Sequence, residues 1–237
     1  MFYPIIPIIV QARTTSSRCP GKVMRVVNGR RLVDFTLEPL KRCQTTKSII
    51  VATSHDPSDD ALADHCRRTG AAVMRGDLKD VAGRFVQALE LFPAEAFVRI
   101  CADSPMIDYR LVDQAVNMYR QTSADLVTNV QYRSFPKGQS VEVVRSETFL
   151  KAVNAMIDSN DREHVTQFMY RNPLQYEIVN FAAEENYGDR SLAIDTEEEF
   201  DRFHHAMSRL SRPPSDLTWL DHVNLIHGLD QPNWAVA

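Results

Sequence analysis

Several features that mark whole classes of protein are missing from this sequence of 237 residues. Its four cysteines show neither CxxC pairing nor metal-ligand spacing, which argues against a disulfide framework and a cysteine metal site. There is no basic excess, because the net charge is −4, so we expect no nucleic-acid partner. The apolar start over residues 1–13 is too short to span a bilayer and lacks a signal peptide's charged region and cleavage site. We therefore expect a reduced, cytoplasmic protein with no membrane partner.

What the sequence does have is an alternation of short β-branched runs and longer amphipathic stretches. The runs predict strands over residues 5–10, 48–54, 71–76, 96–101, 124–130, 140–144, 176–181 and 191–195. Apolar residues at helical spacing predict helices over 31–43, 56–70, 80–92, 109–121, 146–157, 162–171 and 196–210. We expect Pro39 to bend or shorten the first of these helices. Because several strand runs are almost continuously hydrophobic, the pattern predicts an α/β fold, a three-layer α/β/α sandwich around a mostly parallel sheet.

Two segments interrupt this alternation. Residues 131–144 place a Pro-Lys-Gly turn between two extended runs, which indicates an inserted hairpin or lid. Residues 211–216, SRPPSD, indicate a linker before a final helical segment around 217–227. We therefore divide the chain into a domain over 1–210, with the hairpin at about 131–145, and a tail over 211–237. The tail carries both tryptophans, so we expect it to dock on the same domain or on a partner subunit. The hairpin and this aromatic tail would suit a homodimer.

The stretch QARTTSSRCPGK, residues 11–22, follows the first predicted strand and holds three cations and four hydroxyls. Ligands of open α/β sheets bind beyond the carboxyl ends of the strands, where this stretch lies. It lacks the glycines of a P-loop, but Arg13, Arg18 and Lys22 could reach phosphate oxygens. The hydroxyls and backbone N–H groups could complete an anion-binding concavity. The alternative is a solvated surface loop, in which cations are common.

Two aspartates, Asp103 and Asp195, follow predicted strands at the same edge of the sheet. Such a pair suits Mg²⁺, which prefers oxygen ligands and keeps waters and substrate phosphates as the others. Alternatively, Asp195 caps the helix that follows it and Asp103 is only a turn residue.

Arg162, Glu163 and His164 stand together at a helix start and could supply acid, base or metal-binding groups. Neighbouring helical positions point in different directions, so capping and packing are the alternative roles. Cys101 lies between apolar neighbours and is interpreted as a core thiol.

Seven motifs occur in an order that resembles the cytidylyltransferase family, over about residues 5–205. The motifs are IIVQARTTSSRCPGKVM, IIVATSHDPSDD, RGDLKDVAGRF, VRICADSPMID, FPKGQSVEVV, DREHVTQFMYRNP and LAIDTEEEFDRF. The branch most similar is that of spore-coat polysaccharide biosynthesis protein F, whose relatives activate sugar acids with CTP. The resemblance implies a Rossmann-like mixed sheet of the nucleotide-diphospho-sugar transferase type. It also implies Mg²⁺-dependent transfer of CMP from CTP to an acidic acceptor, with loss of pyrophosphate.

The resemblance also assigns roles to individual positions. Residues matching the nucleotide site are Gln11, Ala12, Arg13, Ser17, Arg18, Lys22, Asp80 and Arg84. Those matching the acceptor site are Gly138, Glu142, Arg162, Glu163 and His164. Asp103 and Asp195 match the metal-binding aspartates, and the catalytic set is Arg13, Arg18, Lys22 and Asp103.

Two positions depart from the family pattern. Thr15 replaces a glycine of the triphosphate loop, where a side chain could crowd the phosphates. Ser140 replaces an acidic residue near the acceptor, which puts the usual acceptor in question. Cations that could bind an acidic acceptor are Arg133, Lys137 and Arg162. We expect an enzyme that supplies an activated precursor for surface polysaccharide. The alternatives are a glycosyltransferase of the same fold class and an inactive nucleotide-binding protein.

Overall fold

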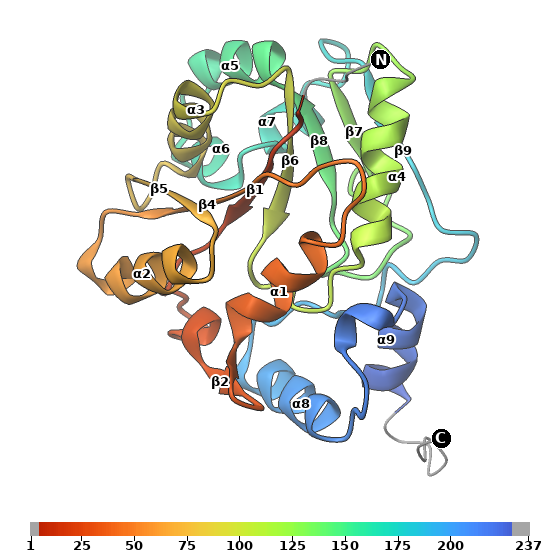
Figure 1. Ribbon diagram of the computed structural model, residues 1–237. Helices are drawn as coiled ribbons and strands as arrows, with labels where there is room; N and C mark the ends of the chain where they lie inside the picture. Colours follow the sequence, from red (N-terminus) through yellow and green to blue (C-terminus); the bar gives the residue numbers. More distant parts are fainter. Residues whose placement is uncertain (1–4, 229–237) are drawn as a thin grey trace.

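A seven-stranded mixed sheet forms the centre of the computed structural model, which describes residues 5–228 (Figure 1). Its strands, in spatial order, are β5 (Ala72–Gly76), β4 (Ile49–Ser54), β1 (Ile8–Gln11), β6 (Ala96–Cys101), β8 (Glu142–Arg145), β7 (Leu126–Thr128) and β9 (Ile178–Asn180). β8 runs antiparallel to β6 and β7, and the other neighbouring pairs are parallel. The prediction of a Rossmann-like mixed sheet is confirmed.

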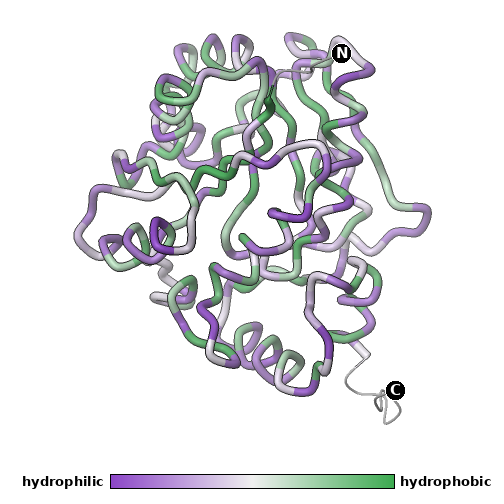
Figure 2. Tube along the Cα trace, viewed as in Figure 1, coloured by the Kyte–Doolittle hydropathy of each residue, from purple (hydrophilic) through white to green (hydrophobic). Residues whose placement is uncertain are grey.

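Helices cover both faces of this sheet, because two apolar clusters pack on its opposite sides. On one face lie α1 (Leu32–Leu40), α2 (Asp60–Arg68) and α4 (Tyr109–Arg120). On the other lie α3 (Val81–Leu91), α5 (Ser146–Ala155), α6 (Ser159–His164) and α7 (Gln167–Arg171). The most hydrophobic segments run along the central strands (Figure 2). The three-layer sandwich is therefore confirmed, and its core is the sheet buried between two helical layers.

A third apolar cluster joins the C-terminal helices to the start of the chain. It contains residues of α8 (Glu197–Ser208) and α9 (Trp219–His227), next to the small hairpin β2 (Val26–Val27) and β3 (Arg30–Arg31). The short 3-10 turns are η1 (Lys22–Met24), η2 (Pro57–Asp59) and η3 (Pro214–Asp216). This cluster brings α8 and α9 beside the loop that follows β1.

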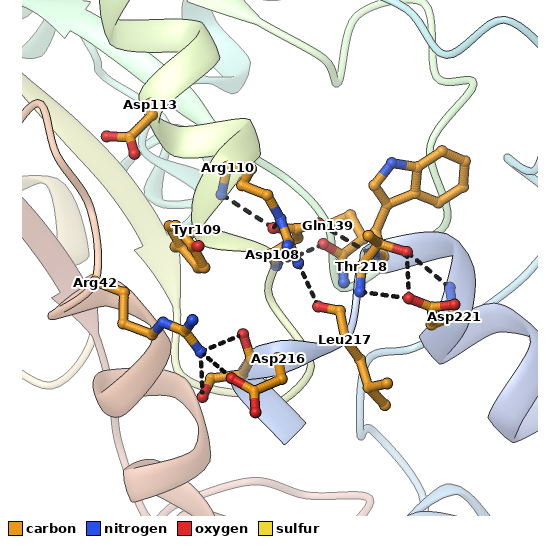
Figure 3. A network of polar contacts seen from close by, with 12 residues as sticks. Arg42, Asp108, Tyr109, Arg110, Asp113, Gln139, Asp216, Leu217, Thr218 and Asp221 are labelled. Carbon is orange, nitrogen blue, oxygen red and sulfur yellow. Dashed lines mark hydrogen bonds and ion pairs between the residues drawn. The ribbon is translucent and has the colours of Figure 1, made fainter. Parts of the chain in front are cut away.

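The tail docks on its own domain through the buried carboxylate of Asp108 (Figure 3). Asp108 Oδ2 accepts a hydrogen bond of 2.9 Å from the backbone N–H of Trp219, and its Oδ1 binds Arg110 at 2.7 Å. Arg42 reaches Asp216 at 2.6 Å. Residues 216–219 of the tail thus contact the first domain, and Trp234 lies outside the described residues.

Three predicted elements differ from the observed ones. Residues 191–195 form no strand but a single bridge between Ser191 and Lys137, next to Gly138, which packs closely against residues 192 and 193. The helix predicted over 162–171 is two helices, separated at Val165, whose φ is 57°. Within residues 131–144, strand structure begins only at 142, in β8 of the main sheet. The helix containing Pro39 ends at residue 40, as expected of a shortened helix.

Candidate active site

A cavity of about 390 Å³ opens at the carboxyl ends of β1 and β6. Parallel neighbouring strands deliver their following loops to one edge of the sheet, so residues distant in sequence meet there. Of the residues predicted for the site, the cavity is lined by Gln11, Ala12, Arg13, Ser17, Arg18, Lys22, Arg84, Asp103, Glu163, His164 and Asp195. The predicted residues Asp80, Gly138, Glu142 and Arg162 lie outside the lining. The loop after β1 therefore lines a cavity, although several of its residues are also exposed to solvent.

The loop after β1 is held in place by Asp59, a buried carboxylate at the end of η2. Asp59 Oδ1 accepts hydrogen bonds of 2.7 Å from both the backbone N–H and the hydroxyl of Thr14. Its other oxygen binds the hydroxyl of Ser54 at the end of β4. Burial acts to raise the pKa of Asp59, but the hydrogen bonds from Ser54 and Thr14 outweigh it and lower the pKa. Sequence reasoning missed this anchor, which only the packing of η2 against the loop reveals.

Lys22 links the two predicted metal-binding aspartates. Gly21 adopts φ 68° just before it and turns the chain, so that the Lys22 side chain is buried. Its Nζ lies 3.0 Å from Asp195 Oδ1 and 3.6 Å from Asp103 Oδ2, and it donates to the carbonyl of Ile194. Arg18 also reaches Asp195, at 3.1 Å. The two aspartates therefore share one cation.

The structure decides against the capping role for Asp195. Thr196 caps α8, with its hydroxyl accepting a 3.2 Å hydrogen bond from the backbone N–H of Glu199. Glu199 in turn accepts from the backbone N–H of Asp195 at 2.7 Å, so the Asp195 carboxylate is left to the cavity. The backbone carbonyl of Asp103 accepts from the N–H of Ile194 at 2.9 Å, which joins the two aspartate segments directly.

Asp103 and Asp195 have the chemistry of a magnesium pair. Both are oxygen donors at one wall of the cavity, and the Lys22 ammonium between them stands where a cation is attracted. Burial raises the pKa of Asp103, and the nearby Asp195 charge acts in the same direction, whereas Lys22 opposes them. A cation at this point would therefore relieve the repulsion between the two carboxylates.

Arg84, on α3, brings to the cavity a buried positive charge that has no ion pair with a described residue. It is only 2% exposed, and its one protein hydrogen bond is a 3.3 Å contact to the carbonyl of Ala52. Its Nε has no partner, and no carboxylate lies within ion-pair distance among the residues described. Burial, together with the like charge of Arg13, lowers the pKa of Arg84 to about 10, although the charges of Asp59, Asp77 and Asp80 act in the opposite direction. An anion in the cavity would supply the missing counter-charge.

Arg99 lines the cavity from β6 and was missed by sequence reasoning, since it lies inside a predicted strand. Its Nε donates to Gln11 Oε1 at 2.9 Å, and its Nη1 binds the buried carboxylate of Glu142. The pKa of Arg99 is raised, because the Glu142 charge outweighs the opposite effect of burial. Glu142 also accepts from Thr166 at 2.7 Å and from Tyr170 at 2.5 Å. Glu142 therefore supports the site through Arg99 and does not line it.

The α6 segment closes the opposite side of the cavity. Glu163 Oε1 binds Arg13 Nη2 at 2.8 Å, and His164 lines the cavity beside it. Arg162 points elsewhere, to Asp80 at 3.2 Å, while Asp80 caps α3 through the N–H of Gly83. The α6 segment therefore contributes Glu163 and His164 to the site, and Arg162 to the packing of α6 against α3.

The sharp turn after α6 sets the directions of the His164 and Thr166 side chains. Val165 is buried, with φ 57° and ψ −67°, and the N–H of Thr166 bonds back to the carbonyl of His164 at 2.6 Å. This γ-turn geometry is rare and strained, above all for a β-branched residue. Its result is that His164 faces the cavity while Thr166 reaches Glu142.

A family model described as cytidylyltransferase matches residues 7–224. The chain belongs to the cytidylyltransferase family. Spore coat polysaccharide biosynthesis protein SpsF of Bacillus subtilis is 29% identical over 204 residues, covering 83% of each chain. A solved cytidylyltransferase from Leptospira borgpetersenii superposes with a TM-score of 0.90 at 23% identity, covering 99% of this chain and 100% of that chain. CMP:2-keto-3-deoxy-manno-octonic acid synthetase in complex with CTP has a TM-score of 0.66 at 16% identity, covering 86% of this chain and 98% of that chain.

These comparisons indicate that this cytidylyltransferase is a nucleotidyltransferase, and members of the family typically use a divalent metal. Among the described residues, no helix is both long enough and apolar enough to cross a bilayer.

The two departures from the cytidylyltransferase pattern have different structural settings. Thr15 is exposed, lies outside the cavity lining and is not among the residues with positive φ, so its side chain does not enter the cavity. Ser140 accepts a 3.1 Å hydrogen bond from Arg133, which has no ion pair among the described residues. Gly138 has φ 88°, and a Cβ there would stand 2.6 Å from backbone atoms of residues 192 and 193. Gly138 therefore sets the path of the segment that leads to Asp195.

Proposed function

We propose that this cytidylyltransferase transfers CMP from CTP to an acidic small-molecule acceptor, with release of pyrophosphate. The observation that supports it most strongly is the buried guanidinium of Arg84, which lines the cavity without a carboxylate partner. The other cations of the lining are Arg13, Arg18, Lys22 and Arg99, and its carboxylates are Asp103, Glu163 and Asp195. Cations thus outnumber carboxylates in the cavity of a protein whose net charge is −4. That excess suits a bound polyanion such as a nucleoside triphosphate.

The reaction that this arrangement favours is an in-line displacement. An acceptor oxygen forms a bond to the α-phosphorus of CTP, the bond to the bridging oxygen breaks, and pyrophosphate leaves with that electron pair. Mg²⁺ held by Asp103 and Asp195 would supply positive charge to the phosphates when bound. Arg13, Arg18 and Lys22 would orient the triphosphate and stabilise the charge that develops on the leaving group.

A second cation without an ion pair among the described residues is Arg133, which lies outside the cavity lining. Arg133 is half-buried, its Nη1 has no hydrogen-bond partner, and burial lowers its pKa. The other two cations considered for the acceptor differ, since Arg162 already pairs with Asp80 and Lys137 is exposed. We propose that the acceptor is a sugar acid or a phosphorylated metabolite, and that the product serves surface polysaccharide synthesis, as the printed name of the SpsF relative suggests.

Pyrophosphate release tests this function. The protein is incubated with Mg²⁺, each of the four nucleoside triphosphates and a panel of sugar acids and phosphorylated metabolites. We expect pyrophosphate to be released with CTP and an acidic acceptor. Asp103→Asn should lower kcat by a factor on the order of 100 or more. Asp201→Asn, which changes an exposed aspartate of α8, is the matched control. A nucleoside diphosphate product, or an undiminished rate in Asp103→Asn, would contradict the proposal.

A further inference from the structure

The Lys22 ammonium occupies the space between the two aspartates that the proposed function gives to a metal. Three contacts hold it there, to Asp195 at 3.0 Å, to Asp103 at 3.6 Å and to the carbonyl of Ile194. The Lys22 side chain is 8% exposed, whereas those of Asp103 and Asp195 are 33% and 36% exposed, so the ammonium is shielded from water and the carboxylates only in part. An ammonium and a metal ion cannot both sit between the same carboxylate oxygens, because their charges repel and the space is shared.

We infer that Lys22 is a positioning residue that holds Asp103 and Asp195 together in place of the metal, and that metal and nucleotide consequently bind together. This inference rests on the proposed function for the identity of the nucleotide. In the nucleotide-free protein, a metal must displace the ammonium from both carboxylates. When a triphosphate enters, its oxygens offer Lys22 a new partner, and the two aspartates are released to the metal.

The donor set supports the same conclusion. No group of three or more histidines, cysteines or carboxylates that could hold a metal occurs within residues 5–228. Mg²⁺ requires six ligands and is commonly held by one or two carboxylates together with substrate phosphates. Two aspartates that are already paired with a lysine therefore make a weak site until phosphate oxygens complete it.

Arg18 provides an internal comparison. It also binds Asp195, at 3.1 Å, but its side chain is 65% exposed and has no contact with Asp103. Solvent screens the charge of Arg18, and Arg18 pairs with only one of the two aspartates. Arg18 should therefore oppose metal binding much less than Lys22 does.

Manganese binding to the nucleotide-free protein tests the inference. Mn²⁺ alone is the probe, and electron paramagnetic resonance of free Mn²⁺ gives the dissociation constant without any enzyme turnover. We expect Lys22→Met to bind Mn²⁺ at least about tenfold more tightly than the wild type, because a positive charge next to both ligands is removed. We expect Arg18→Met to gain less, and Lys151→Met, which removes an exposed lysine of α5, to gain nothing.

Two further variants of Lys22 keep the manganese result decisive. Lys22→Arg retains the charge and must bind Mn²⁺ no more tightly than the wild type. Lys22→Gln, whose amide can still donate to the Ile194 carbonyl, must show the same gain as Lys22→Met and protects the test against misfolding, which circular dichroism checks. An equal or weaker Mn²⁺ affinity in Lys22→Met and Lys22→Gln would overturn the inference. The pyrophosphate-release assay tests the proposed function separately, since the manganese experiment contains no nucleotide.

Discussion

Replacing Arg84 by methionine should stabilise the nucleotide-free protein and weaken CTP binding at the same time. The guanidinium is buried and makes no ion pair with a described residue, so the folded protein carries an electrostatic cost that the unfolded chain does not. Methionine is shorter than arginine, but it is uncharged and flexible, so it removes that cost and fills part of the same space. The same substitution removes the cation that a triphosphate would contact.

The size of the effect follows from the pKa. Burial lowers the pKa of Arg84 from 12.5 to about 10, and each pKa unit corresponds to about 1.4 kcal/mol, so charging the buried group costs about 3 kcal/mol. The lost hydrogen bond to the Ala52 carbonyl offsets about 1 kcal/mol of this. A net gain of about 2 kcal/mol should raise the melting temperature by about 4–8 °C in a protein of this size. Losing one charge-assisted hydrogen bond to phosphate should weaken CTP binding by about 1.5–3 kcal/mol.

Thermal unfolding and isothermal titration with CTP measure the two effects separately. Arg68→Met, which removes an exposed arginine at the end of α2, serves as the matched control and should change neither quantity. The reasoning would be refuted if Arg84→Met melted below the wild type while CTP affinity stayed the same, because Arg84 would then be a structural residue.

Two pH-dependent predictions follow from other buried groups. Burial raises the pKa of Cys101, a thiol that lines the cavity, to about 12. The rate of its labelling by iodoacetamide, followed by mass spectrometry, should therefore increase about tenfold per pH unit from pH 7 to 10. A labelling rate that reaches a plateau below pH 10 would contradict this. Burial lowers the pKa of His222, on α9, to about 4, so the unfolded chain takes up a proton first as the pH falls. The free energy of unfolding should therefore fall by about 3 kcal/mol between about pH 6.5 and 4. His222→Leu should reduce this pH dependence, measured by urea unfolding. An unchanged pH dependence would show that other groups titrate in this range.

The layered architecture could be predicted because it depends on local patterns. Buried strands such as β1 and β6 are short, nearly continuous apolar runs, and α3 and α8 start at capping residues that the sequence displays. The one strand that failed, over residues 191–195, failed for a tertiary reason, since its geometry is set by contact with Gly138. The break of the helix at Val165 has a similar origin, because a buried β-branched residue with φ 57° is imposed by its surroundings and not by its own preference.

The sequence by itself determined the residue types of the candidate site and the order in which they occur, because its arginines, lysine and aspartates stand in the loops that follow predicted strands. Only the tertiary structure decided which of them share a cavity. In the structure Thr196 caps α8, so Asp195 is available to pair with Lys22. Glu142 binds Arg99 from behind and does not line the cavity. The physical reason is that spacing along the chain sets the direction of a side chain only within one element. Charges that meet across 173 residues are brought together by the packing of the sheet and its loops.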